Sequence, residues 1–374
     1  MRKSSMTNKQ IEKRFETIRL IAAVAIGVAM CFVVILMISE KPFDALRYLV
    51  TGPFTSINRF GQIIEKMQPL LLTGCAMNLM ILAGNFSMIP EGAFLLSTCL
   101  TVPIVVINQT VFGGLANLGE LGRIIWVACS VLCAAIIGGI IGTLPSLIKR
   151  KWGCDEVITS IMLNAIIVQF TDWMVKRVLY DEASGLSASK PYPEFARVSR
   201  LIYGTRVSTA IFVGLVLCVV TYLIVYHTKL GYEARLVGLN PSFARYSGIN
   251  VPKVGLLIAA LSGAFAGMGG ILHTLGYNER FSWVAETGFG SDGIFVGILA
   301  KNNPLLLPVS AFALGYLRVG AETMGNNTDV PLELITVMTS FIIMMLAADQ
   351  LFSKAKHNAI VRNAKKLEAA KEAK

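Results

Sequence analysis

The sequence predicts an all-α bundle of transmembrane helices, because its apolar residues are too many and too clustered for a soluble protein. Of the 374 residues, 54% are hydrophobic and 15% are charged, whereas soluble domains carry about a quarter charged residues. The apolar residues gather in runs as long as an α-helix needs to cross a hydrocarbon core about 30 Å thick. We therefore expect a polytopic membrane protein of about ten helices.

The clearest apolar run covers residues 20–38, which include no charged residue. A basic stretch followed by an apolar run also fits a secretory signal peptide. This run, however, is longer than the roughly 7 to 15 residues of a signal-peptide core and lacks a convincing cleavage site. We predict a retained helix here. Further runs are found at 67–83, 92–108, 124–148, 157–175, 208–227, 254–275, 304–320 and 333–352.

The basic residues predict the orientation of the chain. Lys and Arg cluster before the first run and after the last, and such flanks mark cytoplasmic ends. Two cytoplasmic termini require an even number of crossings. Asp292–Ala300 supplies the missing one as a short or broken helix, because it ends at Lys301-Asn302-Asn303-Pro304, where proline disfavours the α conformation of its predecessor. We expect a tail at 1–19, a transmembrane domain at 20–352 and a tail at 353–374.

The connections between the runs follow this orientation with one exception. A basic stretch at 149–151 follows the fourth run, and residues 228–253 carry four basic residues after the sixth. Both connections are therefore predicted to be cytoplasmic. Residues 176–206 carry six basic residues, yet the alternation of the runs puts them on the external side.

Composition and motifs argue against several functions. The net charge of +11 would suit nucleic acid if the basic residues lined one surface, but they flank the outer runs, so we expect no nucleic-acid partner. His227, His273 and His357 lie far apart without metal-site spacing. The sequence shows neither a nucleophile paired with a base nor a P-loop. We expect no enzyme and no cofactor bound by this chain, so a partner would handle any ATP.

Two glycine patterns predict close packing rather than chemistry. Gly138-x-x-x-Gly142 and Gly263-x-x-x-Gly267 lie inside apolar runs, where small residues let helix backbones approach each other. The segment Gly288–Gly293 matches GxGxxG by letter, but it lacks the preceding strand that a dinucleotide site needs. Its glycines favour a turn and close packing at the start of the short helix.

A short helix is predicted at 241–247, in the connection 228–253. Asn240 suits the N-cap, Pro241 the first helical position and Gly248 the left-handed position after the helix. A helix this short is not stable alone in water, so it must dock on another surface. Phe243 and Tyr246 share one face of it and could form an exposed knob, while Arg235 and Arg245 could pair with charges. The docking surface is either a partner protein or the chain's own bundle.

Polar residues in or beside the runs are candidates for a pathway, because buried polar groups in membranes usually line a cavity or pair with one another. Asn164 lies deep in its run and predicts either a cavity or an interhelical hydrogen bond. Glu91 and Asp292 lie at run edges. For Asp292 a solvated helix cap is favoured over contact with a ligand.

Four segments together resemble the permeases of the ribose, simple-sugar and nucleoside branch of bacterial ABC importers. Gly231–Asn250 is similar to their cytoplasmic coupling loop, and Cys154–Asn164 to the start of a middle helix. Ser262–Gly270 resembles their glycine-rich helix, and Gly288–Pro304 resembles their short helix and loop. The four occur in the family's order, and the likeness covers roughly residues 62–350.

The resemblance implies a multi-pass subunit of the bacterial plasma membrane that works with partners. These are a cytoplasmic ABC ATPase that binds ATP and magnesium, a second permease subunit that is a paralogue or a second copy, and an external substrate-binding lipoprotein or periplasmic protein. It also implies that the short helix couples to the ATPase. The coupling residues would be Arg235, Asn240, Pro241, Phe243, Arg245, Tyr246 and Gly248.

The substrate implied is a nucleoside, with simple sugars and riboflavin as alternatives. The chain departs from the family in Gly84–Ala93, where Glu91 and Gly92 match but Ser87, Ile89 and Ala93 do not. A rival of another class is an ion-coupled secondary transporter, which would carry a deep ionisable residue; only Asp172 comes near that description. Residues expected near the pathway are Phe86, Glu91, Asn164, Asp292, Asn302 and Asn303.

Overall fold

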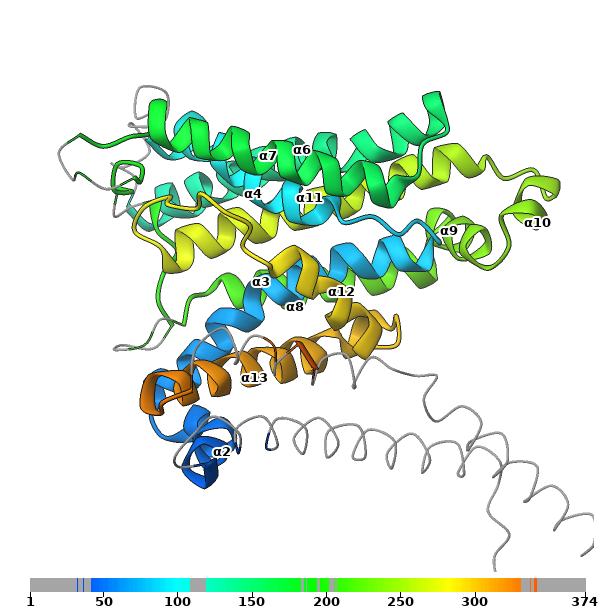
Figure 1. Ribbon diagram of the computed structural model, residues 1–374. Coiled ribbons are helices and arrows are strands. Elements are labelled where there is room, and N and C mark those ends of the chain that lie inside the picture. The colour runs from blue at the N-terminus through cyan, green and yellow to red at the C-terminus, as the bar shows by residue number, and fades with distance from the viewer. Residues whose placement is uncertain are drawn as a thin grey trace, which may run out of the picture. The chain divides into compact units, whose positions relative to one another are not determined.

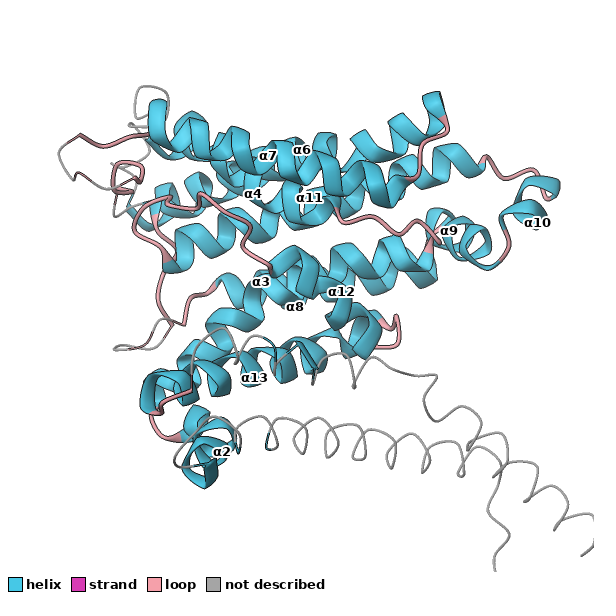
Figure 2. Ribbon diagram, in the orientation of Figure 1, coloured by secondary structure: helices cyan, strands magenta, loops and turns pink. Residues whose placement is uncertain are grey.

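The protein is all-α, as predicted (Figures 1 and 2). The computed structural model describes residues 42–107, 119–182, 185, 187–193, 196–201, 205 and 207–330, together with residues 32, 36, 337, 340 and 341. Within these residues the only β-type pairing is an isolated bridge between Arg200 and Ser208. The predicted helices at 20–38 and 333–352 lie almost wholly outside the described residues, so the expected total of about ten helices stays a prediction.

The chain divides into two compact units. One comprises Phe54–Val319, and the other joins Met1–Pro53 to Gly320–Lys374. In the second unit α2 (Pro42–Thr51) packs against the last turns of α13 (Leu307–Asn327). The approach is close, because a Cβ atom on Gly320 would overlap the carbonyl oxygen of Leu49.

The larger unit is a helix bundle. Its elements are α3 (Ile57–Leu82), α4 (Ile89–Thr101) with the π-helical segment Val102–Ile107, α6 (Gly119–Trp152), α7 (Glu156–Arg177), α8 (Ala210–His227), α9 (Lys229–Leu239), α10 (Pro241–Tyr246), α11 (Val251–Tyr277), α12 (Phe289–Leu299), a 3-10 turn at Pro304–Leu306 and the start of α13. Of the described helices, five are long and apolar enough to cross a membrane: α6, α7, α8, α11 and the segment Pro304–Asn327. A multi-pass membrane protein is therefore confirmed.

Most predicted runs agree with these helices to within a few residues, but two differences are informative. α3 begins at Ile57 rather than 67, because Ser56 caps it by accepting a hydrogen bond from the backbone N–H of Arg59 at 3.2 Å. Charged residues in its first turns make this start much less apolar than the rest of the helix, so it does not stand out in the sequence. The second difference is α9, which was predicted as loop. Its N-cap Thr228 accepts a hydrogen bond from the backbone N–H of Gly231 at 3.1 Å.

α11 lies at the centre of the bundle and packs against α6, α3 and α4 (Figure 1). Its contact with α6 confirms the predicted glycine interface. A Cβ atom on Gly142 would lie 2.5 Å from the carbonyl oxygen of Ala259, and one on Gly263 would lie 2.7 Å from the Cα of Gly142. Larger residues would therefore separate the two backbones.

The short helix predicted at 292–300 is confirmed as α12, which packs against α3 and α4. It begins after Gly288, whose φ of +74° suits a residue without a Cβ atom. It ends in a tight turn in which Lys301 and Asn302 have φ angles of 51° and 55°. The chain then enters α13 through Asn303, whose side chain accepts a hydrogen bond from the N–H of Leu305 at 3.2 Å.

The connection between α7 and α8 is bound to the connection between α11 and α12. Ser189 donates its backbone N–H to the carbonyl oxygen of Phe281 at 2.8 Å, and its hydroxyl accepts from the N–H of Phe281 at 3.0 Å. Arg280 forms an ion pair with Asp181 at 2.9 Å. Burial of the Tyr192 side chain raises the pKa of its hydroxyl well above the usual range. The segment leading to α12 is thus held along its first residues.

Candidate functional site

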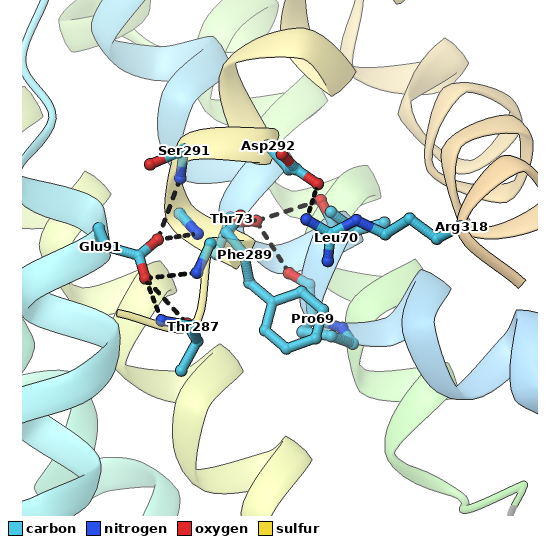
Figure 3. A network of polar contacts seen from close by, with 11 residues as sticks. Pro69, Leu70, Thr73, Glu91, Thr287, Phe289, Ser291, Asp292 and Arg318 are labelled. Atoms are coloured by element: carbon cyan, nitrogen blue, oxygen red, sulfur yellow. Dashed lines mark hydrogen bonds and ion pairs between the residues drawn. The ribbon is translucent and has the colours of Figure 1, made fainter. Parts of the chain in front are cut away.

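The N-termini of α4 and α12 meet inside the bundle, and Glu91 joins them (Figure 3). Glu91 lies in the first turn of α4 and is 2% exposed. One carboxylate oxygen accepts from the backbone N–H groups of Thr287 and Gly288, both at 2.8 Å, and from the Thr287 hydroxyl at 2.9 Å. The other accepts from the N–H groups of Gly290 at 2.6 Å and Ser291 at 3.1 Å. The carboxylate therefore satisfies the otherwise unpaired donors that begin α12.

Asn164 holds the start of α4 from the side of α7. Its amide nitrogen donates to the carbonyl oxygen of Met88 at 2.9 Å, and its amide oxygen accepts from the N–H of Gly92 at 3.1 Å. One turn earlier, the hydroxyl of Ser160 accepts from the N–H of Met88 at 3.0 Å. Of the two predicted roles for Asn164, the structure shows the interhelical hydrogen bond.

Asp292 is not the solvated cap that the sequence favoured. Its side chain is 13% exposed and forms an ion pair with Arg318 of α13, inside the larger unit (Figure 3). The guanidinium carbon of Arg318 also lies 5.3 Å from the centre of the Phe289 ring. Thr73 of α3 donates its hydroxyl to the carbonyl oxygen of Phe289 at 2.8 Å. The first turn of α12 is thus bonded to α3, α4 and α13.

Aromatic side chains surround the same turn. Phe289 lies 5.8 Å from Phe94 of α4 and 5.1 Å from His273 of α11, measured between ring centres. Trp283, in the connection before α12, lies 5.5 Å from Phe94 and 5.8 Å from His273. Phe94 and His273 are buried, whereas Trp283 and Phe289 are half-buried.

The predicted coupling helix is present as α10, and its caps form as expected. The side chain of Asn240 accepts from the N–H of Phe243 at 3.0 Å, and Pro241 occupies the first helical position. Gly248 follows the helix with a φ of +83°. The helix ends at Tyr246 rather than 247, a difference within the ambiguity of helix ends.

Large apolar side chains are exposed on α9 and α10. Tyr246 is 92% exposed, and Leu239 and Phe243 are also exposed. Arg245 is exposed beside them. Arg235 differs, because its guanidinium stacks over the ring of Tyr226 at 5.0 Å and so faces the chain's own α8.

α9 reaches the break between α3 and α4. A Cβ atom on Gly238 would lie 3.1 Å from the backbone nitrogen of Gly84 and 3.0 Å from the carbonyl carbon of Leu82. Only glycine permits this backbone contact. The exposed segment of α9 and α10 is therefore in direct contact with the residues that lead into α4.

Glu91, Asn164 and Asp292, predicted near a pathway, are brought together around the starts of α4 and α12. Phe86 lies partly exposed in the connection before α4. Asn302 and Asn303 lie at the opposite end of α12, where they shape its turn into α13. The partners of the two carboxylates could not be predicted from the sequence. They are Thr287, Gly288, Gly290, Ser291 and Arg318. Arg318 could have been noticed because it is a lone arginine inside an apolar run.

Comparison with known proteins identifies the family. The sequence pattern of the family described as "Branched-chain amino acid transport system / permease component" matches residues 60–348. The chain belongs to this family. It is 29% identical to the guanosine ABC transporter permease protein NupP of Bacillus subtilis, over 87% of this chain and 91% of that protein. It is 25% identical to the nucleoside ABC transporter permease protein NupB of Lactococcus lactis, over 87% of this chain and 89% of that protein.

A more distant relative carries a different substrate in its name. The chain is 24% identical to a glucose ABC transporter permease protein of Haloferax volcanii, over 89% of this chain and 87% of that protein. All three relatives span nearly the whole chain and are named ABC transporter permeases. The predicted class, a permease of the ABC-importer type, is therefore confirmed.

Proposed function

We propose that this permease imports a nucleoside across the bacterial plasma membrane, using ATP that a partner ABC ATPase hydrolyses with magnesium. Two relatives named for guanosine or nucleoside transport support the substrate class. Both termini lie in the cytoplasm, on the same side as α9 and α10. A second permease subunit and an external substrate-binding protein complete the transporter.

The exposed apolar surface of α9 and α10 carries the coupling part of the proposal. Leu239, Phe243 and Tyr246 are exposed on elements that are too polar and too short to cross a membrane. Exposed apolar side chains grouped in this way mark a protein interaction site. α10 packs on α9 and α11, where Ala244 is buried, and its exposed apolar side chains are left for a partner surface. The ATPase is that partner, and Arg245 supplies a charge at the rim.

The contacts of α9 supply a route from the ATPase to the bundle interior. A Cβ atom on Gly231 would lie 2.5 Å from the carbonyl oxygen of Val225, so α9 lies tightly on the end of α8. At its other end, Gly238 touches the α3–α4 break. A displacement of α10 therefore moves the start of α4, and with it Glu91 and the N-terminus of α12. Alternating access requires a junction with two arrangements, and in this proposal the junction of α4 and α12 has them.

Three alternatives differ from this proposal in substrate or in energy source. The relative named for glucose transport makes a simple sugar the second candidate, and riboflavin is the third. An ion-coupled secondary transporter, the less favoured class, needs a carboxylate that can exchange its proton. Each buried or deep carboxylate considered above is already engaged: Asp172 pairs with Lys176 at 2.8 Å, Asp292 with Arg318, and Glu91 with five donors.

Uptake in cells that carry the native operon tests the proposal. The substrates are radiolabelled guanosine, adenosine, cytidine, glucose and riboflavin. The variant Arg245→Glu/Tyr246→Ala is expected to lower nucleoside uptake at least about tenfold, because losing a central aromatic contact of an interface weakens it by about 2 kcal/mol or more. Tyr180→Ala, which removes an exposed tyrosine from the α7–α8 connection, is the matched control and leaves uptake unchanged.

The amount of each variant in the membrane is measured by immunoblot, so that a loss of transport is distinguished from a loss of protein. Nucleoside uptake that persists when this chain is deleted would refute the substrate assignment. Nucleoside uptake that depends on the chain but is equal in both variants would refute the coupling role of α10 alone. Uptake that continues after the partner ATPase gene is deleted would favour the secondary transporter.

A further inference from the structure

Two buried side chains near this junction have polar atoms without a hydrogen-bond partner among the described residues. Gln68 of α3 is 0% exposed, and neither of its amide atoms has a hydrogen-bond partner among the described residues. His273 of α11 is 7% exposed, and its Nδ1 likewise has no partner there. A buried polar atom without a partner destabilises the folded state. Such groups need an explanation, and a ligand that pairs with them is one.

The register of α3 against α11 brings these two side chains to the same level. A Cβ atom on Gly255 would lie 2.7 Å from the side-chain nitrogen of Asn85, three residues beyond the end of α3, and one on Gly269 would lie 3.1 Å from the Cβ of Leu72. Residue numbers rise along one helix as they fall along the other, so the helices are antiparallel. If this register continues for one more helical turn, four residues on each helix, Gln68 lies at the level of His273 along the helix axes.

Aromatic rings lie close to His273. Its imidazole is nearly parallel to the indole of Trp283, with 16° between the planes, and its centre is 5.1 Å from that of Phe289. A Cβ atom on Gly269 would also lie 3.4 Å from the Phe94 ring, which places that ring beside the same turn of α11. Trp283 and Phe289 are half-buried, whereas Phe94 and His273 are buried.

We propose that Gln68, His273, Phe94, Trp283 and Phe289 form the site that recognises the base of a transported nucleoside. This proposal rests on the proposed function. A glutamine amide offers a donor and an acceptor side by side, which matches the edge of a nucleobase. An imidazole adds one further polar contact, and aromatic rings stack on the flat heterocycle. A sugar has polar edges but lacks a flat aromatic face, so this combination fits a base better.

The site is closed in the conformation described, since Gln68 and His273 are buried. The base reaches them when α12 and its preceding connection move away from α3. Phe289 is the first residue of α12, and Trp283 lies six residues before it. The movement that opens the junction at Glu91 therefore also uncovers this site.

Gln68→Leu is the test, with Asn78→Leu as its matched control. Asn78 is another fully buried amide of α3 without a partner among the described residues, but it lies ten residues away, about 15 Å along the helix. Maximal uptake rates are measured for guanosine, adenosine, cytidine and uridine at saturating concentrations. The external binding protein does not limit uptake there. Gln68→Leu is expected to change the ratio between the best and the poorest nucleoside about tenfold, because it removes a two-point contact to the base edge.

Trp283 supplies a second readout that does not depend on the base. Stacking tolerates every base, so Trp283→Leu is expected to lower all four rates about equally, and Trp283→Phe is expected to retain most of the uptake. Unchanged nucleoside ratios in Gln68→Leu, or equal losses in Gln68→Leu and Asn78→Leu, would overturn the site and leave the proposed function standing. Absence of nucleoside uptake by the unaltered transporter would overturn both.

Discussion

Glu91 and Gln68 are polar side chains buried in the same part of the bundle, and their surroundings are opposite. Glu91 accepts five hydrogen bonds, all from residues at the start of α12 or just before it. Gln68 has none among the described residues. Thr73, five residues after Gln68 in α3, donates its hydroxyl to the carbonyl oxygen of Phe289, between the residues that bind Glu91. A saturated group fixes structure, whereas an unsatisfied one is available to a ligand.

The comparison predicts that changes at the two positions alter stability with opposite sign, and the largest effect is expected at Glu91. Glu91→Gln keeps the shape but replaces one accepting oxygen with an NH2 group that faces N–H donors. It also removes the charge that favours a helix N-terminus. The variant is expected to lose roughly 3 kcal/mol of stability and nearly all uptake. The thermal unfolding midpoint of the purified protein and cellular uptake measure the two effects.

Glu286→Gln is the control for this prediction. Glu286 lies in the same connection, five residues before Ser291, but its side chain is exposed. Neutralising an exposed carboxylate changes stability by about 0.5 kcal/mol or less. If both variants unfold at the same temperature as the unaltered protein, the hydrogen bonds of Glu91 do not hold the junction.

A smaller loss is expected at Asp292, where one partner replaces five. Asp292→Asn leaves the Arg318 guanidinium without its carboxylate, in a place where the arginine side chain is 26% exposed. The partial exposure reduces the effect to about 1–2 kcal/mol, below that of a fully buried pair. Adding Arg318→Gln to Asp292→Asn is expected to recover part of the unfolding midpoint, because the unpaired charge is then gone. A double variant less stable than Asp292→Asn would show that Arg318 acts mainly through the Phe289 ring.

Features with a local cause could be predicted from the sequence. Asn240, Pro241 and Gly248 define α10 because a cap, a fixed φ and a left-handed residue each act within one helical turn. The glycine pairs of α6 and α11 could be predicted for a similar reason, since small residues at one helical spacing can only serve a close contact. The apolar runs gave most bundle helices because a membrane fixes the length that spans it.

Features with a tertiary cause could not be predicted. Glu91 was recognised at the edge of a run, but its partners lie about 200 residues away in the chain, and no local pattern relates them. α9 was missed because its sequence is only weakly apolar and its helix is stabilised by contact with α8 and α3. Gln68 was missed because an unpaired amide is visible only when all its neighbours are placed.

The smallest expected effect is the stability change at Gln68, and its sign is the informative part. Gln68→Leu replaces an unpaired buried amide with an apolar side chain of similar size, so the substitution removes no hydrogen bond from the described part of the folded protein. The variant is expected to unfold at the same temperature or higher, with a gain of up to about 1 kcal/mol. A lower unfolding midpoint would mean that the amide has a structural partner in the folded protein. Gln68 would then be a structural group like Glu91, and its amide would not be available to a ligand.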